Sequence, residues 1–391
     1  MHLLIYAGQL RESGGRAIGL GLLRALSQGQ WSHRITAVVP EDESFLGLES
    51  PALAVVPIHT QGGIGQILAS GKVTKIINEL RPDALYMLGN RPLPDSNCPQ
   101  AVHVCLPWAV YPESIAWRTL SPAERFVMKT RVQMTLQNLT KASIVTTQTE
   151  LMMRRIQKVT GLPYDRLALV PNAFSALPGL PDEVSLVADA IRKSPFKTKL
   201  ICVARYMPHK NLEVLVKVAD RLVEAGINDI GIFLTLSDHQ GKGARKMIDA
   251  ITRNGRSNVI VNLGEIPITQ LAECYKAVDA LVFPSLLEAF SGVYVDCMYL
   301  SVPILTSDLD FAHEVCGDAA VYFDPLNPDS IIDAIATLNN QSSMWISRLG
   351  IGHKIVNASA MDWNTIASKV ISIMESVYRA PRVHYHLISN I

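Results

Sequence analysis

The sequence lacks paired cysteines, a long hydrophobic run and any sizeable net charge. Its six cysteines, at positions 98, 105, 202, 274, 297 and 316, show no spacing typical of a disulfide framework or a zinc site, so we expect reduced thiols in the core. No stretch reaches 18 uncharged apolar residues, so no membrane-spanning helix is expected. The start, MHLLIYAGQLRES, reads as a short strand followed by charged residues rather than a signal peptide. We therefore expect a cytoplasmic protein.

The formal net charge is +1, and a balance so close to zero does not favour a nucleic-acid partner. The charges are unevenly distributed along the chain, because residues 1–175 carry 17 Lys and Arg against 12 Asp and Glu. The basic residues concentrate between Arg118 and Lys158. Two interpretations stay open: a peripheral contact with anionic lipid headgroups at the inner membrane surface, and an ordinary solvated helical surface.

What is present points to two folded domains. The chain has 391 residues, of which 48% are hydrophobic and 18% charged, which is enough to build two cores. Short apolar segments alternate with helical patterns, and this alternation predicts an α/β protein with mostly parallel, doubly wound sheets. The expected strands lie at 2–7, 35–39, 52–56, 84–87, 101–105, 143–147, 167–170, 200–204, 231–235, 259–261, 280–283, 303–305 and 320–323. Residues 175–183, SALPGLPDE, form the predicted linker.

The most informative stretch is 281–308, LVFPSLLEAFSGVYVDCMYLSVPILTSD. An apolar run is followed by Glu288 in a small-residue loop, and a helical pattern follows this loop. Asp296 comes eight residues after Glu288 and is expected about two turns into the helix. Free amides at the start of such a helix, beside the backbone of Gly292, would suit an anion or a polar ring. The alternative is that both acids are helix-start residues favoured by the helix dipole.

A basic loop follows the first strand of the second half, with the sequence RYMPHKN at 205–211. Arg205 offers a planar fork of donors and Lys210 a compact point charge. Together they can neutralise a dianionic group such as a diphosphate. Such a pair in a surface loop is usually just solvated, but its place after a buried strand and its company with the acidic loop favour a site. No Asp-x-Asp cluster is placed to hold a metal, so no metal or other cofactor is expected.

These motifs resemble the retaining, nucleotide-sugar-dependent glycosyltransferases of family 4, which have the GT-B fold of two Rossmann-like, doubly wound domains facing each other across a cleft. The resemblance covers nearly the whole chain, with the specific motifs between residues 200 and 325. One departure stands out, because Asp296 occupies a position where the family usually has glutamate. The matching residues are Arg205, Lys210 and Asn211 in the basic loop, and Pro284, Ser285, Glu288, Phe290 and Gly292 in the acidic loop.

The resemblance implies a hexosyltransferase that moves a sugar from a UDP- or GDP-sugar to an acceptor hydroxyl with retention, in bacterial surface polysaccharide synthesis. The implied acceptor is a glycan or a lipid-linked glycan. The implied catalytic residues are Glu288, Arg205 and Lys210. The implied donor site consists of Arg205, Lys210, Gly264, Glu265, Ile266, Glu288, Phe290, Ser291, Gly292, Val293 and Asp296. The acceptor side of the cleft is expected at Gly14, Gly15, His103 and Trp108, although a buried structural histidine is a competing interpretation of His103.

The expected domains are an acceptor-binding domain at 1–174, a nucleotide-sugar-binding domain at 175–361, and a C-terminal helix and tail at 362–391 that return to the first domain. Two other functions stay open. One is a catalytically weak sugar-nucleotide-binding partner subunit, which the Asp296 replacement favours. The other is a GT-B nucleotide-sugar epimerase, whose motifs differ from those quoted.

Overall fold

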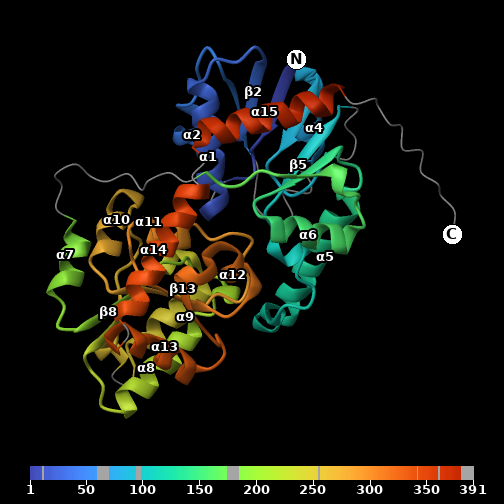
Figure 1. Ribbon diagram of the computed structural model, residues 1–391. Helices are drawn as coiled ribbons and strands as arrows, with labels where there is room; N and C mark the ends of the chain where they lie inside the picture. The colour runs from blue at the N-terminus through green and yellow to red at the C-terminus, as the bar shows by residue number, and fades with distance from the viewer. Residues whose placement is uncertain are drawn as a thin grey trace. The chain divides into compact units, whose positions relative to one another are not determined.

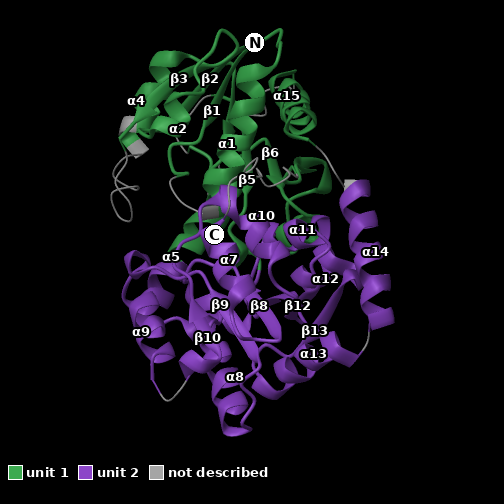
Figure 2. Ribbon diagram, turned by 90° about the vertical axis from the view of Figure 1, so that its left-hand side faces the viewer, with its two compact units in different colours: residues 1–110, 130–173, 361–391 green, residues 111–129, 174–360 purple. Residues whose placement is uncertain are grey.

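The computed structural model describes residues 1–10, 13–59, 70–93, 98–173, 185–253, 256–340, 342–359 and 362–379 (Figure 1). The chain forms two compact units, which Figure 2 distinguishes by colour. Unit 1 comprises residues 1–110, 130–173 and 361–391, and unit 2 comprises 111–129 and 174–360. The sequence-based division grouped 111–129 with the first domain, whereas in the structure these residues pack within unit 2. The predicted linker at 175–183 lies outside the described residues.

Unit 1 is built on a parallel sheet of seven described strands in the order β3-β2-β1-β4-β5-β6-β7. The strands are β1 (His2–Tyr6), β2 (Arg34–Pro40), β3 (Ala54–Ile58), β4 (Ala84–Met87), β5 (Gln100–Val104), β6 (Ile144–Thr147) and β7 (Leu167–Leu169). Each overlaps the segment predicted from the sequence. Strand β3 starts later than predicted because an isolated bridge between Ser50 and Leu53 forms a turn before it.

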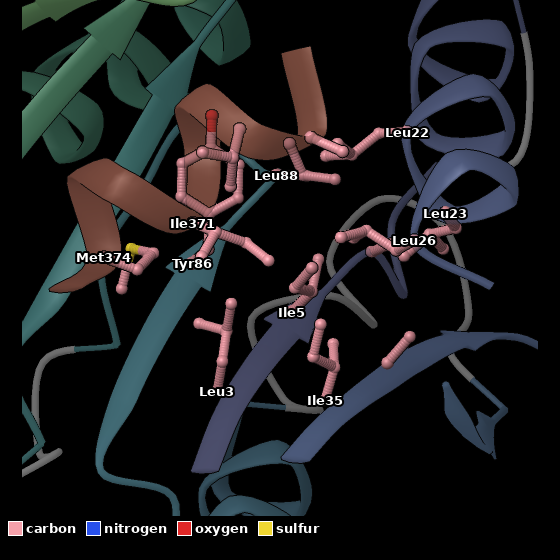
Figure 3. Packing of buried hydrophobic residues seen from close by; sticks show 14 of the residues in the cluster. Leu3, Ile5, Leu22, Leu23, Leu26, Ile35, Tyr86, Leu88, Ile371 and Met374 are labelled. Carbon is pink, nitrogen blue, oxygen red and sulfur yellow. The ribbon is translucent and has the colours of Figure 1, made fainter. Parts of the chain in front are cut away.

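Helices α1 and α15 cover the core of unit 1 (Figure 3). Leu3 and Ile5 of β1 pack there with leucines of α1, and Ile371 and Met374 of α15 complete the cluster. A Cβ atom at Gly21 would lie 2.2 Å from the Trp363 side chain, so glycine permits this close approach of the two helices. The helices of this unit are α1 (Ser13–Gln28), α2 (Glu43–Leu46), α4 (Ser70–Leu80), α6 (Glu150–Thr160), α15 (Trp363–Arg379) and most of α5 (Pro122–Leu139).

Unit 2 contains a parallel sheet of six described strands in the order β10-β9-β8-β11-β12-β13. The strands are β8 (Thr198–Cys202), β9 (Ile230–Leu234), β10 (Ile260–Asn262), β11 (Ala280–Phe283), β12 (Ile304–Ser307) and β13 (Ala320–Phe323). The helices are α7 (Leu186–Lys193), α8 (Glu213–Glu224), α9 (Lys242–Ile251), α10 (Ile268–Lys276), α11 (Gly292–Tyr299), α12 (Asp310–Cys316), α13 (Pro328–Asn340) and α14 (Ser342–Ser359). The predicted α/β architecture with two doubly wound parallel sheets is therefore confirmed.

The described helices and the cysteines bear on two predictions made from the sequence. None of the described helices combines the length and the apolar character needed to cross a membrane. All six cysteines are free thiols, and Cys202, Cys274, Cys297 and Cys316 are buried, as expected for reduced residues of the core.

Candidate functional site

The candidate site lies in unit 2 where the strand order reverses. Strands β8 and β11 are neighbours at the centre of the sheet, although β9 and β10 come between them in the sequence. In open α/β sheets, ligands bind outside the carboxyl ends of the strands at such a switch point. The basic loop follows β8 and the acidic loop follows β11, so the topology brings these two loops together.

Lys210 and Glu288 form an ion pair across this switch point. The distance from Lys210 Nζ to Glu288 Oε1 is 2.5 Å, and the two side chains are only 17% and 10% exposed. The hydroxyl of Ser285 donates to the same carboxylate oxygen over 2.6 Å. The Lys210 ammonium also lies 4.9 Å from the centre of the Phe283 ring, at a distance suited to a cation–π contact. The structure thus joins a residue of the basic loop to one of the acidic loop.

Asn211 fixes the end of the basic loop. It ends the 3₁₀ turn η4 (Pro208–Lys210) with a left-handed backbone, at φ 54° and ψ 37°, a conformation that asparagine tolerates better than most residues. Its side-chain amide donates to the carbonyl of Pro284 over 3.3 Å and to that of Pro325 over 2.7 Å. These bonds tie the loops after β8, β11 and β13 together and place Lys210 over the acidic loop.

His209 was not identified from the sequence, yet it lies at the centre of these loops. Its carbonyl accepts from the backbone amide of Leu286 over 2.8 Å. Burial lowers the pKa of its ring to about 4, with Lys210 lowering it further and Glu288 opposing both. His209 is therefore neutral at pH 7, and the charge of the site comes from its neighbours.

Asp296 is the fifth residue of α11 and lies just over one turn into this helix. The sequence-based placement at two turns was wrong, because the residues between Phe283 and Gly292 form a loop rather than helix. Asp296 is four residues after Gly292 and so lies on the same helix face. Burial raises the pKa of its carboxyl to about 7, and no described group donates a hydrogen bond to it. Burial raises the pKa of the Tyr275 hydroxyl, and the charge of Asp296 adds to this rise. This buried hydroxyl also has no hydrogen-bond partner among the described residues.

The segment Gly264, Glu265 and Ile266 follows β10 at the same edge of the sheet. Gly264 has a φ of +76°, which favours glycine, and a Cβ atom there would meet nothing within 4 Å. Glu265 accepts from the side chain of Gln240 over 3.1 Å, and Gln240 in turn accepts from the backbone amide of Tyr206 over 2.8 Å. This network connects the loops after β8, β9 and β10.

Apart from Arg205, the remaining donor-site predictions lie at the start of α11. Phe290 is partly buried, and Ser291 is buried and precedes the helix without a side-chain cap bond. Gly292, the first helical residue, is exposed, and a Cβ atom there would meet nothing within 4 Å. Val293 follows it and is partly buried. Arg205 is partly buried in the basic loop. The start of α11 is thus open to a ligand that approaches its backbone amides.

The residues predicted for the acceptor side all lie in unit 1. Gly14 and Gly15 form the first turn of α1, so their expected position in a loop before the helix was wrong. A first turn tolerates glycine because its amides have no intrahelical partner. His103 is buried within β5, 3.0 Å from Thr146 Oγ1, and burial lowers its pKa to about 4. Trp108 is 3% exposed. The acceptor role of these four residues stays a prediction.

A segment that sequence reasoning overlooked packs beside the basic loop. The hydroxyl of Ser114 lies 3.4 Å from the Leu286 carbonyl, and the 3₁₀ turn η2 (Ile115–Thr119) packs against η4. The Tyr111 hydroxyl donates to Asp310 over 3.0 Å. Asp308 and Asp310 form an Asp-x-Asp pair, but Asp308 is bound to His313 at 2.6 Å. No group of three or more metal-ligating side chains occurs in the described part of the chain.

Comparisons with known proteins find similarity to glycosyltransferases. Residues 188–351 match the family described as glycosyl transferases group 1. The O-antigen chain mannosyltransferase RfbU of Salmonella typhimurium is 24% identical over 175 residues, which cover 41% of this chain and 48% of RfbU. The O-antigen chain mannosyltransferase B of Escherichia coli is 23% identical over 239 residues, which cover 60% of this chain and 61% of that protein. The matches thus span between about half and three fifths of these relatives.

Among solved structures, the Anabaena protein HepE in complex with UDP superposes with a TM-score of 0.70 and 16% identity. The match covers 96% of this chain and all of HepE. At this identity the likeness shows the fold, which is GT-B with two Rossmann-like domains.

Proposed function

Because residues 188–351 of this chain match the family described as glycosyl transferases group 1, we propose that the protein transfers a sugar from a nucleoside diphosphate sugar to an acceptor hydroxyl. The observation that carries this proposal is the ion pair between Lys210 and Glu288 at the carboxyl ends of β8 and β11. Such a pair places a cation for a diphosphate beside a carboxylate for sugar hydroxyls. Transfer with retention of the anomeric configuration is part of the proposal.

Each residue has a distinct proposed role. Lys210 and Arg205 stabilise the charge that develops on the departing diphosphate. Glu288 accepts hydrogen bonds from the hydroxyls of the donor sugar, and Asp296 contacts the ribose. The open backbone at 264–266 receives the base. Because two cations can neutralise the diphosphate, the proposed reaction needs no metal ion.

The names of the similar proteins favour particular donors and acceptors. HepE binds UDP, which favours a uridine nucleotide, whereas the two related proteins are named as mannosyltransferases of O-antigen chains. We therefore propose a UDP- or GDP-hexose as donor and a glycan or lipid-linked glycan of a surface polysaccharide as acceptor.

The test is donor turnover in the presence of EDTA. The protein is expected to release nucleoside diphosphate slowly from UDP-glucose or GDP-mannose without acceptor, at the same rate with and without EDTA. The donor that is used should also raise the melting temperature, since a ligand at a hundred times its dissociation constant adds about 2.7 kcal/mol to the free energy of unfolding.

Other outcomes would contradict specific parts of the proposal. Binding without turnover would indicate a sugar-nucleotide-binding partner subunit. Conversion of the donor sugar into its epimer would indicate an epimerase. Loss of activity with EDTA, restored by Mg²⁺, would show that the two cations are not sufficient.

Helix α5 supports a contact with the inner membrane surface, which would suit a lipid-linked acceptor. Phe126 and Val127 are 73% and 66% exposed, and Lys129 and Arg131 are exposed on the same helix. Apolar side chains flanked by basic ones complement a surface of anionic headgroups. We propose that this part of α5 rests on such a surface.

Vesicle sedimentation tests this contact. The protein is expected to bind vesicles of phosphatidylglycerol and phosphatidylethanolamine but not phosphatidylcholine alone. Each basic residue near such a surface contributes about 1 kcal/mol, so Lys129→Ala combined with Arg131→Ala should weaken binding roughly 30-fold. The matched control is Lys242→Ala with Lys246→Ala, which removes two exposed lysines of α9. Equal weakening in both pairs would contradict a contact through α5.

A further inference from the structure

The two oxygens of the Glu288 carboxylate have different environments. Oε1 accepts from Lys210 Nζ at 2.5 Å and from Ser285 Oγ at 2.6 Å. No described residue bonds Oε2. Glu288 is 8% exposed, so its carboxylate is nearly enclosed and one of its oxygens remains available to a ligand.

Ser285 is itself fixed. It is fully buried, two residues after the end of β11 and three residues before Glu288. Its hydroxyl lies 3.4 Å from the carbonyls of His209 and Leu287, which is long for a hydrogen bond. A hydroxyl has one proton to donate, and the short contact with a charged oxygen is the strongest of the three. Ser285 therefore donates its one hydroxyl hydrogen bond to Glu288 Oε1.

We propose that Ser285 is a positioning residue that orients Glu288, so that Oε1 stays with Lys210 while Oε2 faces the hydroxyls of the donor sugar. This inference rests on the proposed function. It attributes the selectivity of the protein between donor sugars to the fixed orientation of the Glu288 carboxylate. A carboxylate held by Lys210 alone can rotate and present either oxygen to the ammonium. The second donor removes this freedom, because only Oε1 is within reach of both groups.

The same arrangement leaves Lys210 with donors that Glu288 does not use. An ammonium has three donors, and only one is used by Glu288 in the structure. The other donors of Lys210 can serve a diphosphate whether or not the Ser285 hydroxyl is present. Loss of the Ser285 hydroxyl is thus expected to affect the sugar more than the nucleotide.

The experiment compares Ser285→Ala with Ser307→Ala. Ser307 is a fully buried serine of the same sheet, at the end of β12, and its hydroxyl has no partner among the described residues. Both variants delete one buried oxygen, and thermal unfolding reports any loss of stability. The probes are the epimeric pairs UDP-glucose with UDP-galactose and GDP-mannose with GDP-glucose, together with UDP and GDP alone.

In Ser285→Ala, turnover of the preferred donor is expected to fall roughly 10- to 150-fold, the usual effect of losing a hydrogen bond to a charged group. The preference between epimers should shrink, while the affinity for the free nucleoside diphosphate stays within about twofold of wild type. Ser307→Ala should keep both the turnover and the preference.

Three results would overturn the inference. If Ser285→Ala keeps the wild-type preference between epimers, Ser285 does not orient Glu288. If it weakens the free diphosphate as much as the donor, its role is structural. Both outcomes leave the proposed function standing, because they require an active wild-type protein. If the wild-type protein neither binds nor turns over any of these donors, the proposed function and this inference fail together.

Discussion

Replacing Lys210 by alanine is expected to lower turnover roughly 10²- to 10³-fold, the cost of losing one charge-stabilising donor in an active site. Lys210 is the cation that the structure places against Glu288 at the switch point of unit 2. A low-dielectric setting strengthens its interaction with the charge of a departing diphosphate. Arg205→Ala, in the same loop, is expected to act in the same direction. Turnover of the donor at saturating concentration is the measurement.

Removal of Lys210 also leaves a buried carboxylate without its partner, so a loss of stability has to be separated from a loss of catalysis. Arg256 provides a matched control. It pairs with Asp220 at 2.6 Å, its side chain is 15% exposed, and it precedes β10 and so lies at the opposite edge of the same sheet. Arg256→Ala should lower the melting temperature but keep turnover within about twofold. Wild-type turnover in Lys210→Ala would refute the assignment.

The sequence predicted the parallel sheets because their buried strands are short apolar runs that stand apart from the helical patterns between them. The loops of the site were predictable for a related reason, since Arg205, Lys210 and Glu288 lie in the loops that follow such strands. The direct bond between Lys210 and Glu288 was not predictable from spacing. It depends on β8 and β11 being neighbours, which the order of strands along the chain does not specify.

Errors arose where local patterns do not define where a helix starts. Gly14 and Gly15 suggested a loop but form the first turn of α1, because glycine is tolerated where amides need no partner. Asp296 was placed too deep in its helix because the first of the eight residues that separate it from Glu288 lie in the loop before α11.

The contacts of Ser114 and His209 with the acidic loop were missed because they join segments far apart in the chain. Ser114 lies 172 residues before Leu286 in the sequence. No periodicity or local motif encodes a contact of this kind.

Donor affinity is expected to fall as the pH drops through 7, because burial raises the pKa of Asp296 to about 7. A ribose hydroxyl donates to the ionised carboxylate, and the ionised fraction falls from about nine tenths at pH 8 to about one tenth at pH 6. Affinity for UDP-glucose or GDP-mannose should thus be roughly tenfold weaker at pH 6 than at pH 8. The donor's own phosphates do not titrate in this range, and neither does His209, whose pKa is about 4.

Three substitutions of Asp296 separate its proposed role from a structural one. Asp296→Ala should weaken the donor by about 1.5–3 kcal/mol, or roughly 10- to 150-fold, the worth of a hydrogen bond to a charged group. Asp296→Asn should remove the pH dependence between 6 and 8. Asp296→Glu should keep or improve affinity, because the extra methylene advances the carboxylate by roughly 1.5 Å toward the ribose. Calorimetric titration of the donor at both pH values measures all three. Unchanged affinity in Asp296→Ala would make Asp296 a structural residue of α11 and leave Glu288 as the acid of the site.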